Sequence, residues 1–128
     1  MSEKINYGYM SLSKAISKLE QFVRENEDTE RDHAVMIQAF EFCFELSWKY
    51  IQKLGSDEGE ILASPKRALI FGADVGYILD RKIWADMLSM RNRSVHTYNE
   101  EVALEISTAI KARFLAEFLR IREAFKKS

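Results

Sequence analysis

The chain has 128 residues, 47% of them hydrophobic and 30% charged, which is enough apolar material for one domain with its own core. Five glycines and one proline are few for a loop-rich or all-β fold, and a 12% aromatic content excludes a disordered chain. A formal net charge of −1 excludes a generally basic nucleic-acid coat and a polybasic membrane binder, although it leaves room for a local basic site.

The charges are unevenly distributed along the chain. Residues 20–60 contain eleven acidic and four basic side chains, whereas residues 61–98 contain six basic and three acidic ones. A dipolar surface is therefore expected if the two segments fold onto different faces.

The cysteine content and the apolar runs bear on the compartment. Cys43 is the only cysteine and lies between two phenylalanines, which is typical of a buried thiol that packs as a small hydrophobe in a reducing compartment. No apolar run is long enough to cross a bilayer, and the first ten residues lack the pattern of a signal peptide. We expect a cytoplasmic protein that has no membrane partner.

The first predicted elements are two helices. Apolar residues at helical spacing define the first, namely Leu12, Ile16, Leu19 and Val23. The second helix is long and is predicted from Thr29, a good N-cap, to Leu54, with Gly55 ending it. Its apolar stripe consists of Ile37, Phe40, Phe44, Trp48 and Ile51.

Three further helices are predicted in the second half of the chain. A short one starts at Ser64 and Pro65, a favourable N-cap and first-turn pair, and ends near Phe71. Another starts at Asp80 and turns Ile83, Trp84, Met87 and Leu88 inward. The last starts near Asn99, and its stripe consists of Val102, Ile106, Ile110, Phe114, Phe118 and Ile121.

No stretch alternates long enough to be a strand, so the sequence predicts an all-α fold. The expected architecture is an up-and-down four-helix bundle with an additional short helix, which forms a single domain over residues 1–128.

The histidines and the cysteine do not indicate a metal site. His33 and His96 are far apart, and neither has the short spacing to Cys43 or to the other that is typical of zinc ligands. His33, at the start of a helix beside acidic residues, is predicted to be a structural histidine at the surface or partly buried. There is no glycine-rich phosphate loop and no nucleophile elbow, so no metal and no cofactor are expected.

The segment from Met90 to Asn99 concentrates groups that can hold a phosphate and move a proton. Arg91 and Arg93 offer planar cationic forks, and His96 can exchange protons near neutral pH. On one straight helix Arg91 and His96 lie about 140° apart and do not converge. A joint site therefore requires a helix break near His96, with Thr97 or Asn99 capping the next helix, or a second copy of the chain. The alternative is a polar helix end with ordinary capping and salt bridges.

Several segments in order resemble one family. Arg91, His96 and Tyr98 resemble the R-x4-H-x-Y signature of HEPN domains, in the branch called nucleotidyltransferase substrate-binding proteins or HepT-type toxins. Residues 40–49 are similar to its F-E-F-x-F-E-L-x-W-K segment, although Cys43 stands where a small polar residue is common. Residues 64–67 resemble its S-P-[RK] helix start, with Lys66 in place of the usual Arg, and residues 84–90 resemble its W-x-x-M-L run.

The resemblance implies a homodimer in which Arg91 and His96 of two chains meet, and which cleaves RNA as a metal-independent endoribonuclease. Arg91 would steady the scissile phosphate, His96 would act as general acid or base for attack by the 2′-hydroxyl, and Asn92 would orient the site. Arg93 is a candidate RNA contact. In such a dimer, two copies of the basic segment 61–98 would form a small groove that collects RNA, and the acidic segment 20–60 would be left for an outer or partner-facing surface.

The resemblance also implies a partner, a minimal nucleotidyltransferase (MNT) antitoxin, which attaches AMP to Tyr98 and so blocks RNA entry. The alternative activity is that of a non-catalytic subunit, which binds nucleotide or substrate for a two-component nucleotidyltransferase.

Overall fold

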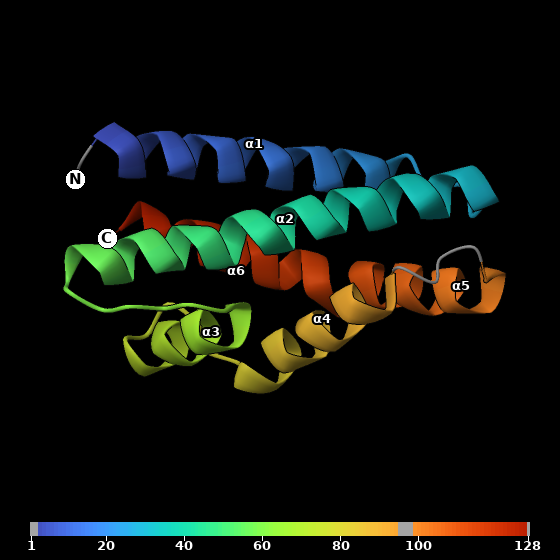
Figure 1. Cartoon of the computed structure of the whole chain (residues 1–128). Coiled ribbons are helices and arrows are strands. Elements are labelled where there is room, and N and C mark those ends of the chain that lie inside the picture. Colours follow the sequence, from blue (N-terminus) through green and yellow to red (C-terminus); the bar gives the residue numbers. More distant parts are fainter. Residues whose placement is uncertain (1–2, 95–98, 128) are drawn as a thin grey trace.

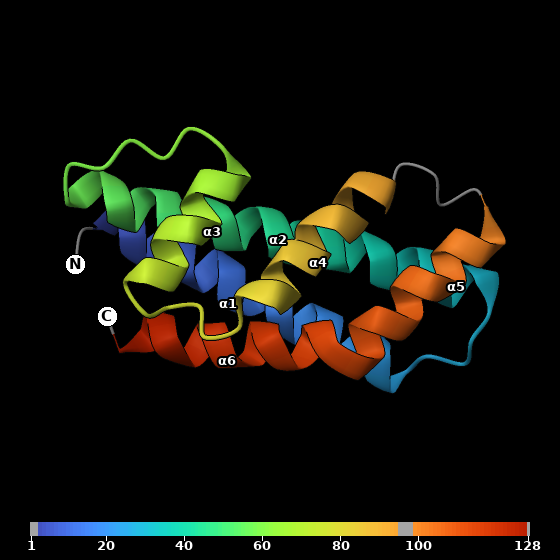
Figure 2. The same cartoon turned by 90° about the horizontal axis from the view of Figure 1, so that it is seen from below.

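The computed structural model describes residues 3–94 and 99–127. Helix α1 (Glu3–Arg24) lies beside the longer α2 (Glu30–Asp57), and α6 (Leu115–Lys126) packs against α1 (Figure 1). Helices α3 (Pro65–Asp74) and α4 (Arg81–Arg93) lie together on the α2 side of the bundle (Figure 2). Helix α5 (Glu100–Ala109) continues through a π-helical turn, η2 (Ile110–Phe114), directly into α6.

The described residues confirm the predicted fold class. No strand occurs among them, and α5, η2 and α6 together form the one long last helix that the sequence predicts. Counted in this way, four longer helices and the short α3 make up the bundle. In the described ranges, no helix combines the length and the apolar character needed to span a bilayer.

Local sequence signals explain where most of the helices begin. Thr29 and Asp32 form a reciprocal capping box at the start of α2, and Ser64 accepts a hydrogen bond from the Arg67 backbone N–H ahead of Pro65. Asp80 caps α4, and the Asn99 side chain accepts from the first N–H groups of α5. These N-caps lie where the sequence predicts them.

Two helices end later than the sequence predicts, and the residue predicted to end the first of them is wrong. Helix α2 continues through Gly55 to Asp57. Gly55 is buried within the helix, where Leu62 packs so closely that an added Cβ would lie 2.6 Å from Leu62 Cδ1. The left-handed turn residue is instead Gly59, at φ +83°. The short helix α3 also extends past Phe71 to Asp74.

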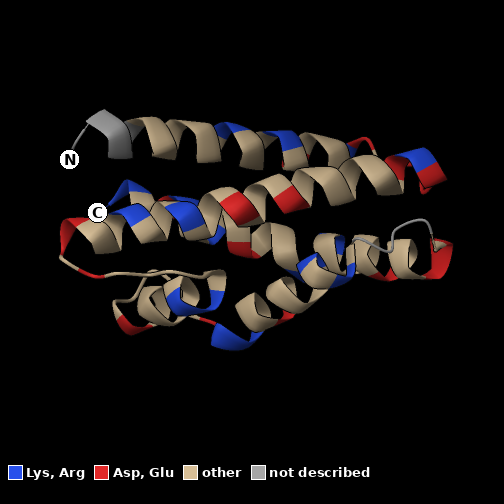
Figure 3. Ribbon diagram, in the orientation of Figure 1, with Lys and Arg blue, Asp and Glu red and all other residues tan. Residues whose placement is uncertain are grey.

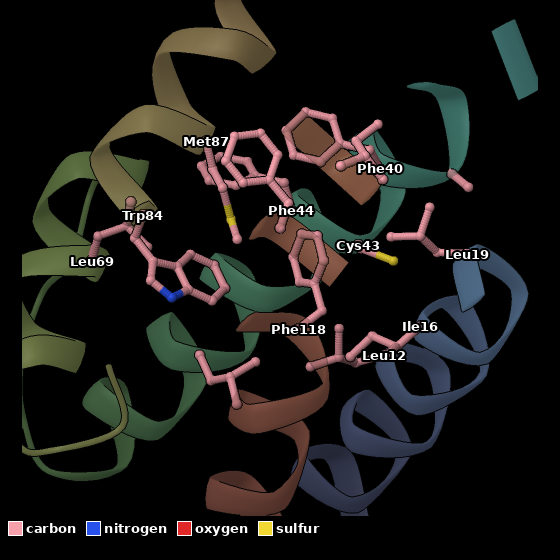
Figure 4. Close-up of a cluster of buried hydrophobic side chains, with 14 of the residues drawn as sticks. Leu12, Ile16, Leu19, Phe40, Cys43, Phe44, Leu69, Trp84, Met87 and Phe118 are labelled. Atoms are coloured by element: carbon pink, nitrogen blue, oxygen red, sulfur yellow. The ribbon is translucent and has the colours of Figure 1, made fainter. Parts of the chain in front are cut away.

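The core contains the predicted stripes of all the long helices. Leu12, Ile16 and Leu19 of α1 are fully buried and face the aromatic side chains of α2 and α6 (Figure 4). Phe40 stacks on Phe114 with ring centroids 5.4 Å apart, and Trp84 meets Phe118 edge-on at 5.6 Å. This packing joins α2, the first half of α4 and the last helix.

Cys43 is buried in this core, as predicted (Figure 4). Burial raises the pKa of its thiol to about 12. The thiol therefore stays protonated near neutral pH and packs as a small apolar group, and it does not serve as a nucleophile.

Candidate functional site

Arg91, in the last turn of α4, is bound to Glu45 in the middle of α2. Its Nε lies 2.8 Å and its Nη2 lies 2.6 Å from the same carboxylate oxygen, Glu45 Oε1. Its Nη1 donates to Asn92 Oδ1 at 3.2 Å. The Arg91 side chain is 33% exposed and that of Glu45 is 29% exposed, so the pair lies at the surface with one side open to solvent.

Glu45 is itself held in place by a neighbour. Its second oxygen accepts the indole N–H of Trp48 at 2.9 Å, one turn along α2. The carboxylate therefore has partners on both oxygens, and its orientation toward Arg91 is fixed by the helix. This arrangement limits the rotamers open to the guanidinium and positions it without a ligand.

Ser94 and Glu41 form a second contact between the same two helices. The Ser94 hydroxyl, 4% exposed, lies 2.7 Å from the Arg91 carbonyl oxygen and 3.0 Å from Glu41 Oε2. Its single proton can serve only one of these acceptors at a time. Glu41 and Glu45 are one turn apart on α2, so both carboxylates face the end of α4. Residues 40–49, which resemble one family motif, thus meet residues 91–94, the described start of the other motif, in space.

Arg93 points to a different neighbour. Its guanidinium makes a two-pronged ion pair with Glu105 of α5, at 2.9 and 2.6 Å. The pairing raises the pKa of Arg93 and lowers that of Glu105, chiefly through the side-chain hydrogen bonds between them. Arg93 thereby links the last turn of α4 to α5, and its expected contact with RNA stays a prediction.

The predicted residues His96 and Tyr98 lie outside the described residues. Helix α4 ends at Arg93 and α5 begins at Glu100, so the chain does not run from one to the other as a single helix. The break predicted near His96 itself falls on residues outside the described ranges. That Arg91 and His96 form one site, within a chain or between two chains, stays a prediction.

His33 anchors the start of α5, the helix that follows the motif segment. Its side chain is 5% exposed, more deeply buried than predicted, and its Nδ1 lies 2.9 Å from Glu100 Oε1. Its Nε2 faces Asp28 Oδ1 at 3.5 Å. These contacts are typical of a structural histidine, whereas the predicted position of His33, at the surface or partly buried, is wrong because its side chain is buried.

Asp28 completes this anchor. It also receives the Lys111 ammonium at 3.0 Å and the Asn26 side-chain amide at 3.0 Å. The Asn26 hydrogen bond above all, followed by those of Lys111 and His33, lowers the pKa of Asp28 to about 2. Polar contacts to α2 therefore hold the described residues on either side of 95–98, with Arg91 and Ser94 before this stretch and Glu100 after it.

The charge pattern of the site differs in one respect from the sequence-based expectation. Glu41 and Glu45 belong to the acidic segment 20–60, yet they are bound to Ser94 and Arg91 at the end of α4. Acidic positions on α2 and basic positions on α4 can be followed in Figure 3. Sequence reasoning missed both residues as parts of the site. Their spacing of four, within the segment that resembles the family, was the available signal.

The donors needed for a metal centre do not gather in the part of the chain that the structure describes. No group of three or more His, Cys, Asp and Glu side chains lies close enough there to hold an ion. What the described cluster offers is a positioned, partly exposed guanidinium beside an amide, which is suited to binding an anion such as a phosphate.

Comparison with known proteins connects this arrangement to one family. The family model described as nucleotidyltransferase substrate binding protein like matches residues 7–127. No match was found among curated proteins.

Solved structures give three informative neighbours. A Thermus thermophilus protein is 29% identical, with a TM-score of 0.75, and the match covers 91% of this chain and 96% of the other. A Haemophilus influenzae protein, described as having the fold of a substrate-binding domain of a nucleotidyltransferase, is 28% identical, with a TM-score of 0.80 and coverage of 92% and 98%. The complex of a tri-AMPylated Shewanella oneidensis HEPN toxin with an MNT antitoxin contains a chain of the same fold, at 17% identity, a TM-score of 0.81 and full coverage of both chains.

Proposed function

Because this chain belongs to the nucleotidyltransferase substrate-binding protein-like family, we propose that it is the toxin of a HEPN/MNT toxin–antitoxin pair. In this proposal it cleaves RNA as a metal-independent endoribonuclease and acts as a homodimer. The observation that carries the proposal is the Arg91 guanidinium, which Glu45 holds at the end of α4 with a third of the side chain exposed. Asn92 extends the same cluster with a neutral amide.

The proposed reaction uses the 2′-hydroxyl of RNA as the nucleophile. His96 takes the proton from that hydroxyl, whose oxygen attacks the adjacent phosphorus. The bond to the 5′-oxygen breaks, and the departing oxygen takes up a proton, which leaves a 2′,3′-cyclic phosphate and a free 5′-hydroxyl. Arg91 balances the charge that develops on the phosphoryl oxygens. A second His96, from the other protomer, supplies the acid if the two sites adjoin.

The cognate partner in this proposal is an MNT antitoxin. The hydroxyl of Tyr98 attacks the α-phosphorus of ATP on the transferase, a Tyr–AMP bond forms, and pyrophosphate leaves. The Shewanella oneidensis neighbour, an AMPylated toxin in complex with an MNT antitoxin, supports this pairing through its shared fold. The added phosphate lies seven residues after Arg91 in the sequence and competes with RNA for that guanidinium.

A second candidate function is a non-catalytic subunit that binds nucleotide or substrate for a two-component nucleotidyltransferase. The Haemophilus influenzae neighbour, at 28% identity, supports this interpretation because it is described as a nucleotidyltransferase substrate-binding domain. The ion pair between Arg91 and Glu45 is also compatible with an arginine that binds an anionic ligand without taking part in its cleavage.

RNA cleavage in the presence of EDTA separates the two functions. Purified wild-type dimer is expected to cleave RNA, and Arg91→Ala and His96→Ala are expected to lose cleavage. Equal cleavage by wild type and His96→Ala, or none by clean wild type, contradicts the nuclease. The non-catalytic subunit is supported instead by two results together. Calorimetry then shows that the wild-type chain binds nucleotide and that Arg91→Ala does not, and neither the wild-type chain nor any variant cleaves RNA.

A further inference from the structure

A pocket between α3 and α4 lies apart from the Arg91–Glu45 cluster and shares no residue with it. Its volume is about 360 Å³, which falls in the range of small-molecule sites. Helix α3 contributes Leu69, Ile70 and Ala73 to the lining, and α4 contributes Trp84, Ala85 and Leu88. The pocket therefore has two helical walls, on the side of the bundle that carries α3 and α4 (Figure 2).

The floor of this pocket is rigid and apolar. Trp84 is 1% exposed and its indole N–H is bound to Glu117, so the ring is a fixed part of the packed floor and leaves almost no exposed surface of its own. Leu69, 8% exposed, points toward the same ring (Figure 4). Both walls carry alanines, Ala73 and Ala85, where larger side chains would fill the space between the helices. The hollow is thus set by small residues on a packed floor.

Two cations border the pocket, and they differ in their partners. Arg81, in the first turn of α4, is paired with Asp74 at the end of α3, at 2.7 Å. Lys66 lies at the opposite end of α3, in its first turn. Within the described residues, Lys66 makes no hydrogen bond or ion pair. The pocket therefore has an apolar body and one uncompensated positive charge at one end.

We propose that this pocket binds a small amphipathic anion. The ligand has a flat aromatic or short alkyl body that packs against Ile70 and Leu88, above the Trp84 floor and between the two alanines. It also has a single carboxylate, sulfonate or phosphate that pairs with Lys66. A polar ligand without an apolar body loses its hydration against this lining and gains too little in return. A cationic ligand of the same shape is repelled by Lys66. The size of the hollow and its closed floor favour a small molecule over a second copy of the chain.

The test uses three naphthalene derivatives of matched shape: 2-naphthoate, 2-naphthamide and 2-naphthylmethylammonium. Binding to the full chain is measured by calorimetry and by quenching of tryptophan fluorescence. We expect naphthoate to bind with a saturable isotherm at one site per chain, more tightly than the amide, and the ammonium not to bind. Lys66→Gln is expected to weaken naphthoate about fivefold, as for an exposed charge pair, and to leave the amide unchanged.

Two further variants make the outcome decisive. Ala85→Leu fills the hollow from an exposed helical position and is expected to abolish binding of both naphthoate and the amide. Lys82→Gln removes a neighbouring exposed lysine that does not line the pocket, and it is expected to leave every affinity unchanged. The proposal is overturned if wild type shows no saturable binding, if Ala85→Leu binds normally, or if Lys82→Gln and Lys66→Gln have the same effect. It is also overturned if, without ligand, the wild-type chain is a dimer and the Ala85→Leu variant is a monomer, because a second copy of the chain then covers the hollow. None of these readouts depends on RNA cleavage.

Discussion

Trp84 of α4 donates its indole N–H to Glu117 of α6 across 3.2 Å, and the receiving carboxylate is only 3% exposed. The other oxygen of Glu117 accepts Nη2 of Arg120 at 2.6 Å. A buried anion with partners on both oxygens ties the helix that carries Arg91 to the last helix of the bundle. The cost of desolvating the carboxylate is offset by these two hydrogen bonds.

Glu117→Ala is therefore expected to lower the free energy of unfolding by about 2–3 kcal/mol, because it leaves the buried indole N–H without its acceptor and opens a hole in the core. Urea unfolding followed by circular dichroism measures the effect. Glu123→Ala, at an exposed position of α6, is the matched control and is expected to change stability by less than about 0.5 kcal/mol. Equal losses in the two variants contradict the role given to the buried carboxylate.

Glu45→Ala tests the positioning of Arg91. Without the carboxylate the guanidinium samples other rotamers, and the rate of RNA cleavage is expected to fall about 10²-fold, the scale of a misplaced catalytic group. Initial rates are compared with the affinity for an uncleavable RNA, which is expected to change much less. Glu105→Ala frees Arg93 in a comparable way and serves as the control, with a rate within about twofold of wild type. An unchanged rate in Glu45→Ala rules out the positioning role.

Tyr98→Phe tests the proposed AMP acceptor. Incubation of the wild-type chain with its partner transferase and ATP is expected to raise its intact mass by AMP units, and Tyr98→Phe is expected to show no increase because it lacks the attacking hydroxyl. Tyr77→Phe, whose ring packs on Phe125 in the core, is the control and should still gain mass. Undiminished labelling of Tyr98→Phe assigns the acceptor to another residue.

Asp28 gives a pH-dependent prediction. Its pKa in the folded chain is lowered to about 2 from an ordinary 3.8, chiefly by the Asn26 hydrogen bond, so the folded state favours the carboxylate. The stabilisation is fully present above about pH 4 and is lost as the pH falls toward 2, because the carboxyl group then becomes protonated in both states. Thermal melts of wild type and Asp28→Asn are expected to differ slightly at pH 7 and to coincide near pH 2.

Asn is a suitable replacement because it tolerates the left-handed backbone of Asp28, at φ +60°. Asp57→Asn, at the exposed end of α2, controls for the removal of a negative charge. A gap between wild type and Asp28→Asn that persists unchanged at pH 2 argues against the assigned pKa.

Two glycines in helices should respond to alanine in opposite ways. In α1, a Cβ on Gly8 meets its nearest neighbours at 3.4 Å, an ordinary contact, so Gly8→Ala is expected to stabilise by about 0.5–1 kcal/mol through helix propensity. In α2, a Cβ on Gly55 comes to 2.6 Å from the buried Leu62, so Gly55→Ala is expected to destabilise by about 1–2 kcal/mol. Chemical unfolding of both variants measures the difference, and a gain in stability from Gly55→Ala shows that Leu62 yields at little cost.

The same glycine shows where sequence reasoning failed. A glycine after an apolar stripe is a common helix end, but at Gly55 the missing side chain makes room for Leu62, which returns from a loop seven residues later. Such a contact depends on the tertiary structure and leaves no local trace. The N-caps at Thr29, Ser64, Asp80 and Asn99 were predictable because each acts on N–H groups within three residues.

The π-helical turn was absent from the prediction, although the sequence contains its signal. The last stripe, from Val102 to Phe118, advances by four residues at every step. In an ideal α-helix each such step overshoots a full turn by about 40°, so four steps would carry the stripe about 160° around the helix. The wider turn at Ile110–Phe114 absorbs an extra residue, and Ile106, Ile110, Phe114 and Phe118 all remain fully buried.

At the candidate site, the sequence predicted residues that are close together in the chain, and the structure adds residues of α2 that are far from them in sequence. The motif around Arg91 can be recognised from its neighbours in sequence, whereas Glu45 lies 46 residues away and is identified only when α2 and α4 pack together. Arg91 and Asn92 are in contact in the described cluster, whereas His96 and Tyr98 are outside the residues that the structure describes.

The pairing of Arg91 with Glu45 has a consequence for binding thermodynamics. The guanidinium carries its own internal counterion, so an RNA phosphate that reaches it meets a charge that the protein has already partly neutralised, and it releases little salt from that position. Each arginine that is neutralised in this way should drop out of the dependence of RNA affinity on salt concentration. A dimer that contacts RNA mainly through such pre-paired arginines would recognise the nucleic acid over a wide range of ionic strength.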